Sequence, residues 1–186
     1  MRRIDTALPG VCLIEPEVWR DARGFFFESY QEMRFAEMGI REHFVQDNHA
    51  RSVQGTLRGL HYQITRPQAK LCRVIQGAVL DVVVDVRRGS PTFGRHVAEV
   101  LSAENLRMVY VPQGFAHGYA VLTETAEFLY KCSDFYFPQY ERGVLWSDPA
   151  LAIDWRVSSP ILSDKDLTHL PLAAISADDL PLYEAT

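Results

Sequence analysis

Gly-Thr-Leu-Arg-Gly-Leu-His-Tyr-Gln-Ile-Thr-Arg-Pro-Gln-Ala-Lys-Leu-Cys-Arg-Val-Ile-Gln-Gly, residues 55–77, is the stretch that decides the fold. Two strand-like segments, 56–63 and 70–76, lie on either side of an Arg-Pro turn. Polar side chains interrupt their apolar pattern, among them His61 and Lys70. An imidazole that can act as a base and a fixed cation so close in the chain indicate proton transfer beside a developing negative charge.

Outward from this stretch, short apolar segments recur about every ten residues between Gly and Pro turns, a pattern typical of an all-β sandwich or barrel. The strongest strand is 78–86, where Leu80, Val82, Val84 and Val86 alternate onto one face. Further strands are expected at 10–14, 25–30, 96–101, 108–111, 117–122 and 126–133, and short helices at 31–38 and 163–170. We therefore expect one mainly β domain over residues 1–186, with a peripheral tail from about residue 171.

The composition favours a globular protein with a small ligand. Apolar residues make up 47% and charged residues 23%, and the net charge of -5 gives no general attraction for nucleic acid or anionic membranes. Three widely spaced cysteines predict buried reduced thiols and a cytoplasmic location. No apolar run approaches ~18 residues and no export signal is evident, so no membrane span is expected.

Two motifs have the spacing of a cupin, a jelly-roll β-barrel. Residues 55–63 carry Gly, five residues, then His-x-Gln, and residues 112–117 read Pro-x-Gly-x-x-His. Metal-binding cupins use three histidines and a glutamate. Here Gln63 replaces one histidine, and Lys70 puts a positive charge where the metal would lie. The motifs therefore predict a barrel whose mouth performs metal-free chemistry.

The geometry around His61 stays open at this level. Strict alternation places Arg58 and His61 on opposite strand faces, although Gly59 between them could host a bulge that re-aims one of them. A lone histidine is more often a core residue than a catalyst, but the neighbouring cations and the polar run 163–166 favour function. Tyr130 matters only if it faces the lumen opposite His61.

A series of motifs, in order from about residue 3 to residue 171, resembles the dTDP-4-dehydrorhamnose 3,5-epimerases. The motifs are Asp21-x-Arg-Gly-x-Phe-x-Glu28, Gln46-Asp-Asn48, Leu57–Gln63, Gln68-x-Lys-Leu71, Asp85-x-Arg87, Ser90–Gly94, Pro112–Gly118, Tyr130-Lys131, Glu141-Arg-Gly143 and Ser163-x-Lys-Asp166. The resemblance implies a metal-free homodimeric cupin without a cofactor. Its substrate would be dTDP-4-dehydro-6-deoxy-D-glucose, inverted at C3 and C5 through enolates of the 4-ketone.

The resemblance also implies roles for individual residues. His61 would be the base, Asp166 would orient it, Lys70 would stabilise the enolate and Tyr130 would be the acid on the opposite side. Substrate binding would fall to Arg23, Phe25, Glu28, Gln46, Asn48, Arg58, Gln63, His117, Tyr136, Glu141 and Lys165. An acidic protein with a basic mouth would then hold the diphosphate.

Three alternatives remain open. A single-centre epimerase of a dTDP-4-keto-6-deoxy sugar would carry the same His, Lys and Tyr. A non-catalytic cupin could bind a nucleotide sugar, although it would need no acid–base pair. A metal-dependent cupin such as a dioxygenase is disfavoured by Gln63 and Lys70.

Overall fold

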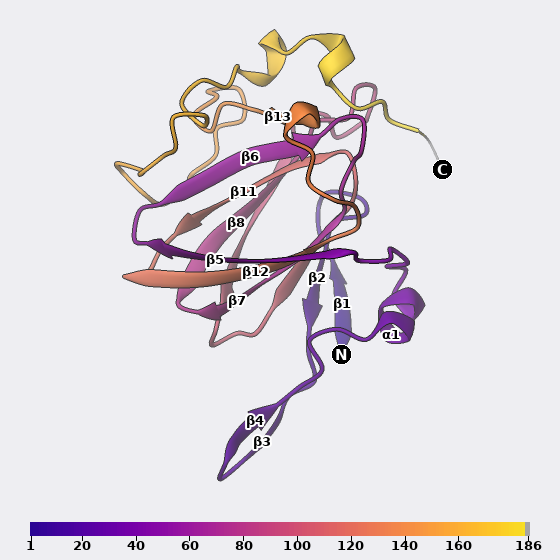
Figure 1. Ribbon diagram of the computed structural model, residues 1–186, viewed down its shortest axis with the longest axis vertical. Coiled ribbons are helices and arrows are strands. Elements are labelled where there is room, and N and C mark those ends of the chain that lie inside the picture. The colour runs from indigo at the N-terminus through magenta and orange to yellow at the C-terminus, as the bar shows by residue number, and fades with distance from the viewer. Residues whose placement is uncertain (185–186) are drawn as a thin grey trace.

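Within residues 1–184, which the computed structural model describes, two antiparallel sheets pack face to face (Figure 1). The six-stranded sheet has the order β1-β2-β10-β7-β12-β5, and the five-stranded sheet has the order β13-β6-β11-β8-β9. The mainly β fold expected from the sequence is confirmed. The strands are β1 (Arg2–Asp5), β2 (Cys12–Glu15), β3 (Trp19–Asp21), β4 (Gly24–Phe26), β5 (Gln46–Val53), β6 (Leu57–Gln63), β7 (Lys70–Gln76), β8 (Ala78–Asp85), β9 (His96–Ser102), β10 (Met108–Val111), β11 (Phe115–Val121), β12 (Thr125–Cys132) and β13 (Glu141–Gly143).

The strand β8 lies in the interior of the five-stranded sheet, between β11 and β9. Val79 and Val83 point into the core between the two sheets, whereas Leu80, Val82 and Val84 belong to a second core on the outer face. The predicted alternation is therefore correct, and both faces are buried. The sequence of such a strand is a nearly continuous apolar run, because neither of its faces is exposed to solvent.

Residues 144–180 cover the outer face of the five-stranded sheet (yellow-orange segment in Figure 1). Leu172 and Leu180 are buried there, so the tail expected to be peripheral contributes to a core. Two short 3-10 helices, η2 (Leu172–Ala174) and η3 (Ala177–Asp179), lie in this tail, and a third, η1 (Pro138–Tyr140), precedes β13. The helix predicted at 163–170 is wrong. The segment forms turns instead, because its polar groups are satisfied locally.

The helix α1 (Glu32–Glu37) agrees with the prediction for 31–38. The Gln31 side chain caps its N-terminus, and Gly39 follows it with a φ of +86°. Phe35 is fully buried against the outer face of the six-stranded sheet. Because α1 lies on the outside of the sheet, it leaves the space between the sheets free.

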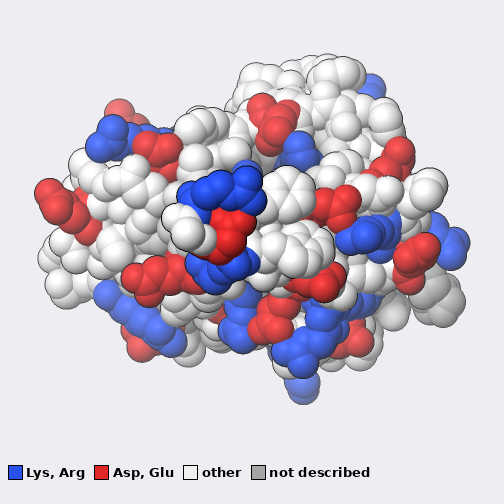
Figure 2. All heavy atoms as spheres, turned by 90° about the horizontal axis from the view of Figure 1, so that it is seen from below, with Lys and Arg blue, Asp and Glu red and all other residues white. Residues whose placement is uncertain are grey.

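The ribbon β3–β4 projects away from the body (Figure 1). The strand predicted at 25–30 is therefore wrong: β4 ends at Phe26, and the Phe25 and Phe26 side chains are mostly exposed. Figure 2 looks at the molecule from this lower end and shows cations and carboxylates interspersed over the face. Within residues 1–184, β3 and β4 pair only with each other, and Trp19, Phe25 and Phe26 form an exposed apolar surface on the ribbon.

The three cysteines, Cys12, Cys72 and Cys132, are buried and unpaired, as predicted. Among the helices of residues 1–184, none is both long and apolar enough to cross a membrane.

Candidate active site

A cavity of about 780 Å³ opens between the two sheets. Its walls come from different sheets. His61 on β6 is paired with His117 on β11, whereas Tyr130 and Cys132 on β12 pair with β7, where Lys70 lies opposite Cys132. The cavity is lined by Gln46, Asn48, Ala50, Thr56, Leu57, Arg58, His61, Tyr62, Gln63, Gln68, Lys70, His117, Gly118, Tyr119, Phe128, Tyr130, Cys132, Tyr136, Glu141, Ile161, Leu162, Ser163, Lys165 and Asp166.

The local backbone at Gly59 explains how Arg58 and His61 both reach this cavity. The β6–β11 pairing shifts register between His117 and Tyr119, directly opposite Gly59. Gly59 has a φ of +111°, and a Cβ there would lie 2.5 Å from the Cα of Gly118. Only glycine fits that conformation and that close approach. The irregularity considered from the sequence is therefore present.

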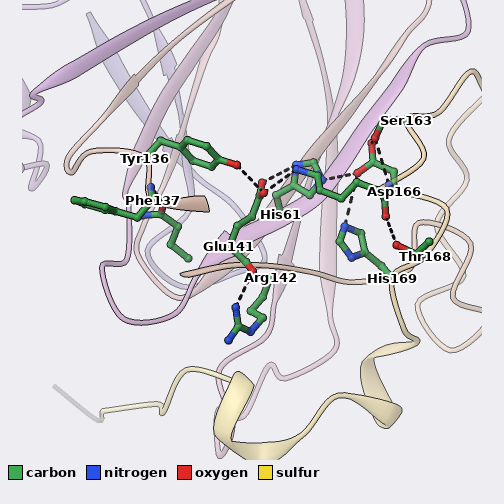
Figure 3. Close-up of polar contacts among 11 residues, drawn as sticks. His61, Tyr136, Phe137, Glu141, Arg142, Ser163, Asp166, Thr168 and His169 are labelled. Atoms are coloured by element: carbon green, nitrogen blue, oxygen red, sulfur yellow. Dashed lines mark hydrogen bonds and ion pairs between the residues drawn. The ribbon is translucent and has the colours of Figure 1, made fainter. Parts of the chain in front are cut away.

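His61 forms a close pair with Asp166. The Nε2 atom of His61 lies 2.5 Å from Oδ1 of Asp166, and the hydroxyl of Ser163 donates to Oδ2 at 2.8 Å (Figure 3). Asp166 is buried, and burial alone would raise its pKa, but the hydrogen bonds from His61 and Ser163 outweigh burial and lower it. An ionised Asp166 accepts a hydrogen bond from Nε2–H. The lone pair of neutral His61 is therefore on Nδ1.

Glu141 lies on the other side of the same ring. Its Oε1 is 3.8 Å from His61 Nδ1, while Oε2 accepts from the Tyr136 hydroxyl at 2.9 Å and from the Lys165 ammonium at 2.7 Å (Figure 3). Burial would raise the pKa of Glu141, but Lys165, His61 and Tyr136 together lower it. His61 thus lies between two ionised carboxylates, one at each nitrogen.

The opposite wall carries an acid and a free cation. Burial raises the pKa of Tyr130, so its phenol stays protonated and can donate. Among the described residues, no hydrogen bond or ion pair engages the Lys70 ammonium, which lines the cavity. The wall that carries Tyr130 and Lys70 can therefore supply a proton and stabilise negative charge on a ligand. On the wall of His61, Arg58 of β6 donates through Nε to Ser52 Oγ at 3.2 Å, so its two NH₂ groups remain available.

The residues at the cupin metal positions do not fit a metal. The Gln63 amide donates to the backbone carbonyls of Arg66 and Phe135 and accepts from the Phe137 N–H, so it holds the 135–137 loop. The Nε2 atom of His117 is bonded to Asp81 at 2.9 Å. The Gln63 amide and the Nε2 atoms of His61 and His117 are thus engaged in protein contacts. Gln63 also lines the cavity, so the substrate contact expected from the sequence stays a prediction.

Three predicted binding residues lie outside the cavity of the chain. Arg23 is on the projecting ribbon and pairs with Asp21, Phe25 is exposed beside it, and Glu28 pairs with Arg34. None of these three side chains lines the cavity of its own chain. The remaining predicted binding residues do line it: Gln46, Asn48, Arg58, Gln63, His117, Tyr136, Glu141 and Lys165.

Two polar residues beside the site, the partly buried His169 and the buried Asp81, were not predicted. His169 lies 3.7 Å from Asp166 Oδ1, with its ring edge-on to His61, and Gly143 leaves room for it, because a Cβ at 143 would come within 2.3 Å of that ring. Asp81 holds His117. For Asp81, the sequence offered one sign of a special role, a carboxylate within an otherwise apolar strand. For His169 it offered none.

The family model described as dTDP-4-dehydrorhamnose 3,5-epimerase matches residues 5–174. The chain belongs to this epimerase family. A relative named dTDP-4-dehydrorhamnose 3,5-epimerase from Pseudomonas aeruginosa is 56% identical over 168 residues, which span 89% of this chain and 93% of the relative. The resemblance seen in the motifs is confirmed.

Solved structures of epimerases superpose on almost the whole chain. The dTDP-6-deoxy-D-glucose-3,5-epimerase of Legionella pneumophila, in complex with dTDP-4-keto-L-rhamnose, has a TM-score of 0.97 at 48% identity and covers 99% of both chains. A 3′-monoepimerase of Streptomyces bikiniensis in complex with dTDP-quinovose has a TM-score of 0.88 at 38% identity, covering 96% of this chain and 92% of that one. The epimerase family therefore includes members that differ in the centres they invert.

Proposed function

We propose that this member of the epimerase family inverts C3 and C5 of dTDP-4-dehydro-6-deoxy-D-glucose to give dTDP-4-dehydro-L-rhamnose. The observation that carries the proposal is the opposition of the two walls: His61 with its carboxylate on one sheet, and Tyr130 with Lys70 on the other. A flat enolate held between them loses a proton to one side and gains one from the other. Delivery to the opposite face is what inverts a carbon centre.

Each group has a role that follows from its surroundings. His61 Nδ1 takes a proton from the carbon next to the 4-ketone, and Asp166 stabilises the imidazolium that forms. Lys70 stabilises the negative charge that moves onto the ketone oxygen, a contribution of about 3–4 kcal/mol to the barrier. Tyr130 protonates the opposite face. The ketone itself is the electron sink, so the reaction as proposed needs no cofactor.

The cavity suits a sugar linked to a nucleoside diphosphate. Its volume, about 780 Å³, lies in the range of small-molecule sites. The lining includes three cations, Arg58, Lys70 and Lys165, against the carboxylates Glu141 and Asp166. With Glu141 and Asp166 engaged by Lys165 and His61, Arg58 remains for the diphosphate. We propose Gln46, Asn48, His117 and Tyr136 as further contacts.

We propose that the protein acts as a homodimer in which the β3–β4 ribbon of one copy reaches the cavity of the other. The support is that Arg23 and Phe25 lie on an exposed ribbon that pairs with no other strand of residues 1–184, and Glu28 follows that ribbon. Arg23 of a second copy would add the cation that a diphosphate needs. Co-expression of Arg23→Ala with His61→Asn tests this, because only mixed dimers contain one complete site. Activity no greater than that of each variant alone would reject the exchange.

The reaction is tested by incubating the protein with dTDP-4-dehydro-6-deoxy-D-glucose in deuterated water and locating deuterium by NMR. Label at both C3 and C5, with the L-rhamno product, is the expected result. No label at either carbon would mean a nucleotide-sugar-binding cupin instead.

The second candidate is a single-centre epimerase, favoured by the similarity to the S. bikiniensis 3′-monoepimerase. Both reactions use a base and an acid on opposite walls, so the site described here suits either. Stable label at only one carbon in the same experiment would establish it.

A further inference from the structure

Inversion at two centres, the function proposed above, creates a proton imbalance. Each inversion leaves a proton on His61 and removes one from Tyr130. In a glucose-configured ring the C3 and C5 hydrogens lie on the same face, so the same base must act twice in the same direction. His61 must therefore lose its first proton before it can take the second, while the sugar still occupies the cavity.

On the Asp166 side of His61, the carboxylate is buried and the side-chain groups bound to its oxygens donate to it. The Asp166 side chain is 3% exposed, and its oxygens are occupied by His61 Nε2 and the Ser163 hydroxyl. Behind it lies His169, whose Nε2 is buried without a hydrogen-bond partner among the described residues (Figure 3). Burial, and then the nearby His61, lower the pKa of His169, which keeps it neutral. Ser163 is exposed, but its hydroxyl already donates to Asp166 Oδ2 and accepts from the Asp166 N–H, so it is not oriented to take a proton from the carboxylate.

The Glu141 side is open. Glu141 Oε1 faces His61 Nδ1 at 3.8 Å and has no other contact among residues 1–184, because Tyr136 and Lys165 both bind Oε2. The two partners reach solvent: the Lys165 side chain is 48% exposed and Tyr136 is 46% exposed. Nδ1 is also the atom that receives the substrate proton. A small rotation of either side chain brings Oε1 within hydrogen-bonding distance of Nδ1–H.

We infer that Glu141 is the proton exit of the base: it takes the proton from His61 Nδ1 after the first inversion and passes it to water at the Lys165–Tyr136 rim. In the inversion, the C–H bond breaks, its proton goes to Nδ1 and its electron pair moves to the ketone oxygen. That pair then returns to carbon, restores the ketone and binds the proton of the Tyr130 O–H, which leaves a phenolate. In the reset, the Nδ1–H proton moves to the Glu141 carboxylate and then to water, and water returns a proton to the Tyr130 phenolate. The cycle balances without any other reactant. This assigns Glu141 to the base rather than to the nucleotide.

The test is Glu141→Gln, which keeps the size and the Tyr136 contact but cannot carry a proton. Enzyme in excess is mixed with dTDP-4-dehydro-6-deoxy-D-glucose in deuterated water, quenched at intervals and read by NMR. Label at the first carbon should slow as well, because the Glu141 charge also lies beside the imidazolium, but label at the second carbon should slow more. Singly labelled sugar should then accumulate, with its ratio to doubly labelled sugar raised about tenfold or more. Added imidazole should restore the second label in the variant and leave the wild type unchanged.

A matched control is Glu127→Gln, because Glu127 pairs with His49 at 3.0 Å on the surface and does not line the cavity. It should behave as wild type. Glu141→Asp keeps a carboxylate and should fall between wild type and Glu141→Gln; it also tests the proposal if the glutamine variant does not fold. Equal slowing of both labels without imidazole rescue, or no change at all, overturns the proton exit. Absence of label in the wild type would instead overturn the proposed reaction.

Discussion

Replacing Asp166 with asparagine removes the charge that His61 needs while it leaves the shape of the site almost unchanged. When His61 takes a proton, its imidazolium lies against Asp166 with an Nε2–Oδ1 distance of 2.5 Å. For charge centres about 4 Å apart at an effective dielectric constant of about 20, that attraction is about 4 kcal/mol. At about 1.4 kcal/mol per factor of ten, its loss alone lowers the rate about 10³-fold.

A second effect acts in the same direction. The asparagine NH₂ group can donate to Nε2, which places the ring proton on Nδ1 and removes the lone pair that faces the substrate. In a triad of similar geometry the corresponding change costs about 10⁴-fold. We therefore expect Asp166→Asn to lower kcat by about 10³- to 10⁴-fold, with a much smaller change in dTDP affinity.

The assay is the rate of deuterium incorporation at C3 and C5 by NMR, with dTDP affinity measured by calorimetry on the same preparation. Asp179→Asn is the control, because Asp179 pairs with Arg142 and does not line the cavity. Ser163→Ala, which removes one hydrogen bond but keeps the carboxylate, should cost no more than about tenfold. Turnover of Asp166→Asn within about tenfold of wild type would refute the assignment of His61 as a base oriented by Asp166.

The other predictions concern the opposite wall and a buried carboxylate. Tyr130→Phe should lower turnover by at least about 10²-fold and leave dTDP affinity within a few fold, as steady-state kinetics and calorimetry would show; near-normal turnover would reject Tyr130 as the acid. Lys70→Ala should lower kcat about 10²–10³-fold with little change in dTDP affinity, and a pure affinity loss would contradict its role at the enolate. Desolvation would raise the pKa of buried Asp85, but hydrogen bonds from Arg87, Ser90 and Thr92 outweigh it and hold that pKa low. The stability they contribute is therefore complete above the unfolded pKa of about 3.9 and is lost as the pH falls through the lower folded value. Asp85→Asn should lower the free energy of unfolding at neutral pH by about 3 kcal/mol and flatten its decline below about pH 4 in urea titrations; an unchanged acid decline would contradict this.

The strands were predictable where burial imposes an alternating pattern. The bounds of β7 and β10 agree with those expected from the sequence because their side chains alternate between defined environments. The strand β1 was missed because Arg2–Asp5 is a polar edge strand. The strand predicted at 25–30 failed because its aromatic residues are exposed, whereas an apolar run is normally taken as buried. Apolar side chains that are exposed in one chain look the same in sequence as core residues.

The candidate site residues could be picked out from their residue types and motifs, but the contacts between them in space could not. Asp166 is 105 positions from His61, and only the packing of the 163–170 turns against β6 brings the two together. His169 and the Glu141–Lys165 ion pair are likewise brought close to His61 only by the fold, because they lie on other segments of the chain. A local pattern reports what a side chain can do. Which nitrogen of His61 is free is decided by groups that the fold supplies.

The two-sheet architecture itself accounts for inversion rather than simple exchange. A base that removed and returned a proton on one face would restore the original centre. Here β6 carries His61 and β12 carries Tyr130, and these strands belong to different sheets on either side of the cavity. The separation is maintained by two independent hydrogen-bonded ladders, so no movement of a loop is needed to create it. In the proposed reaction, a sugar ring held between the sheets would therefore meet His61 on one face and Tyr130 on the other.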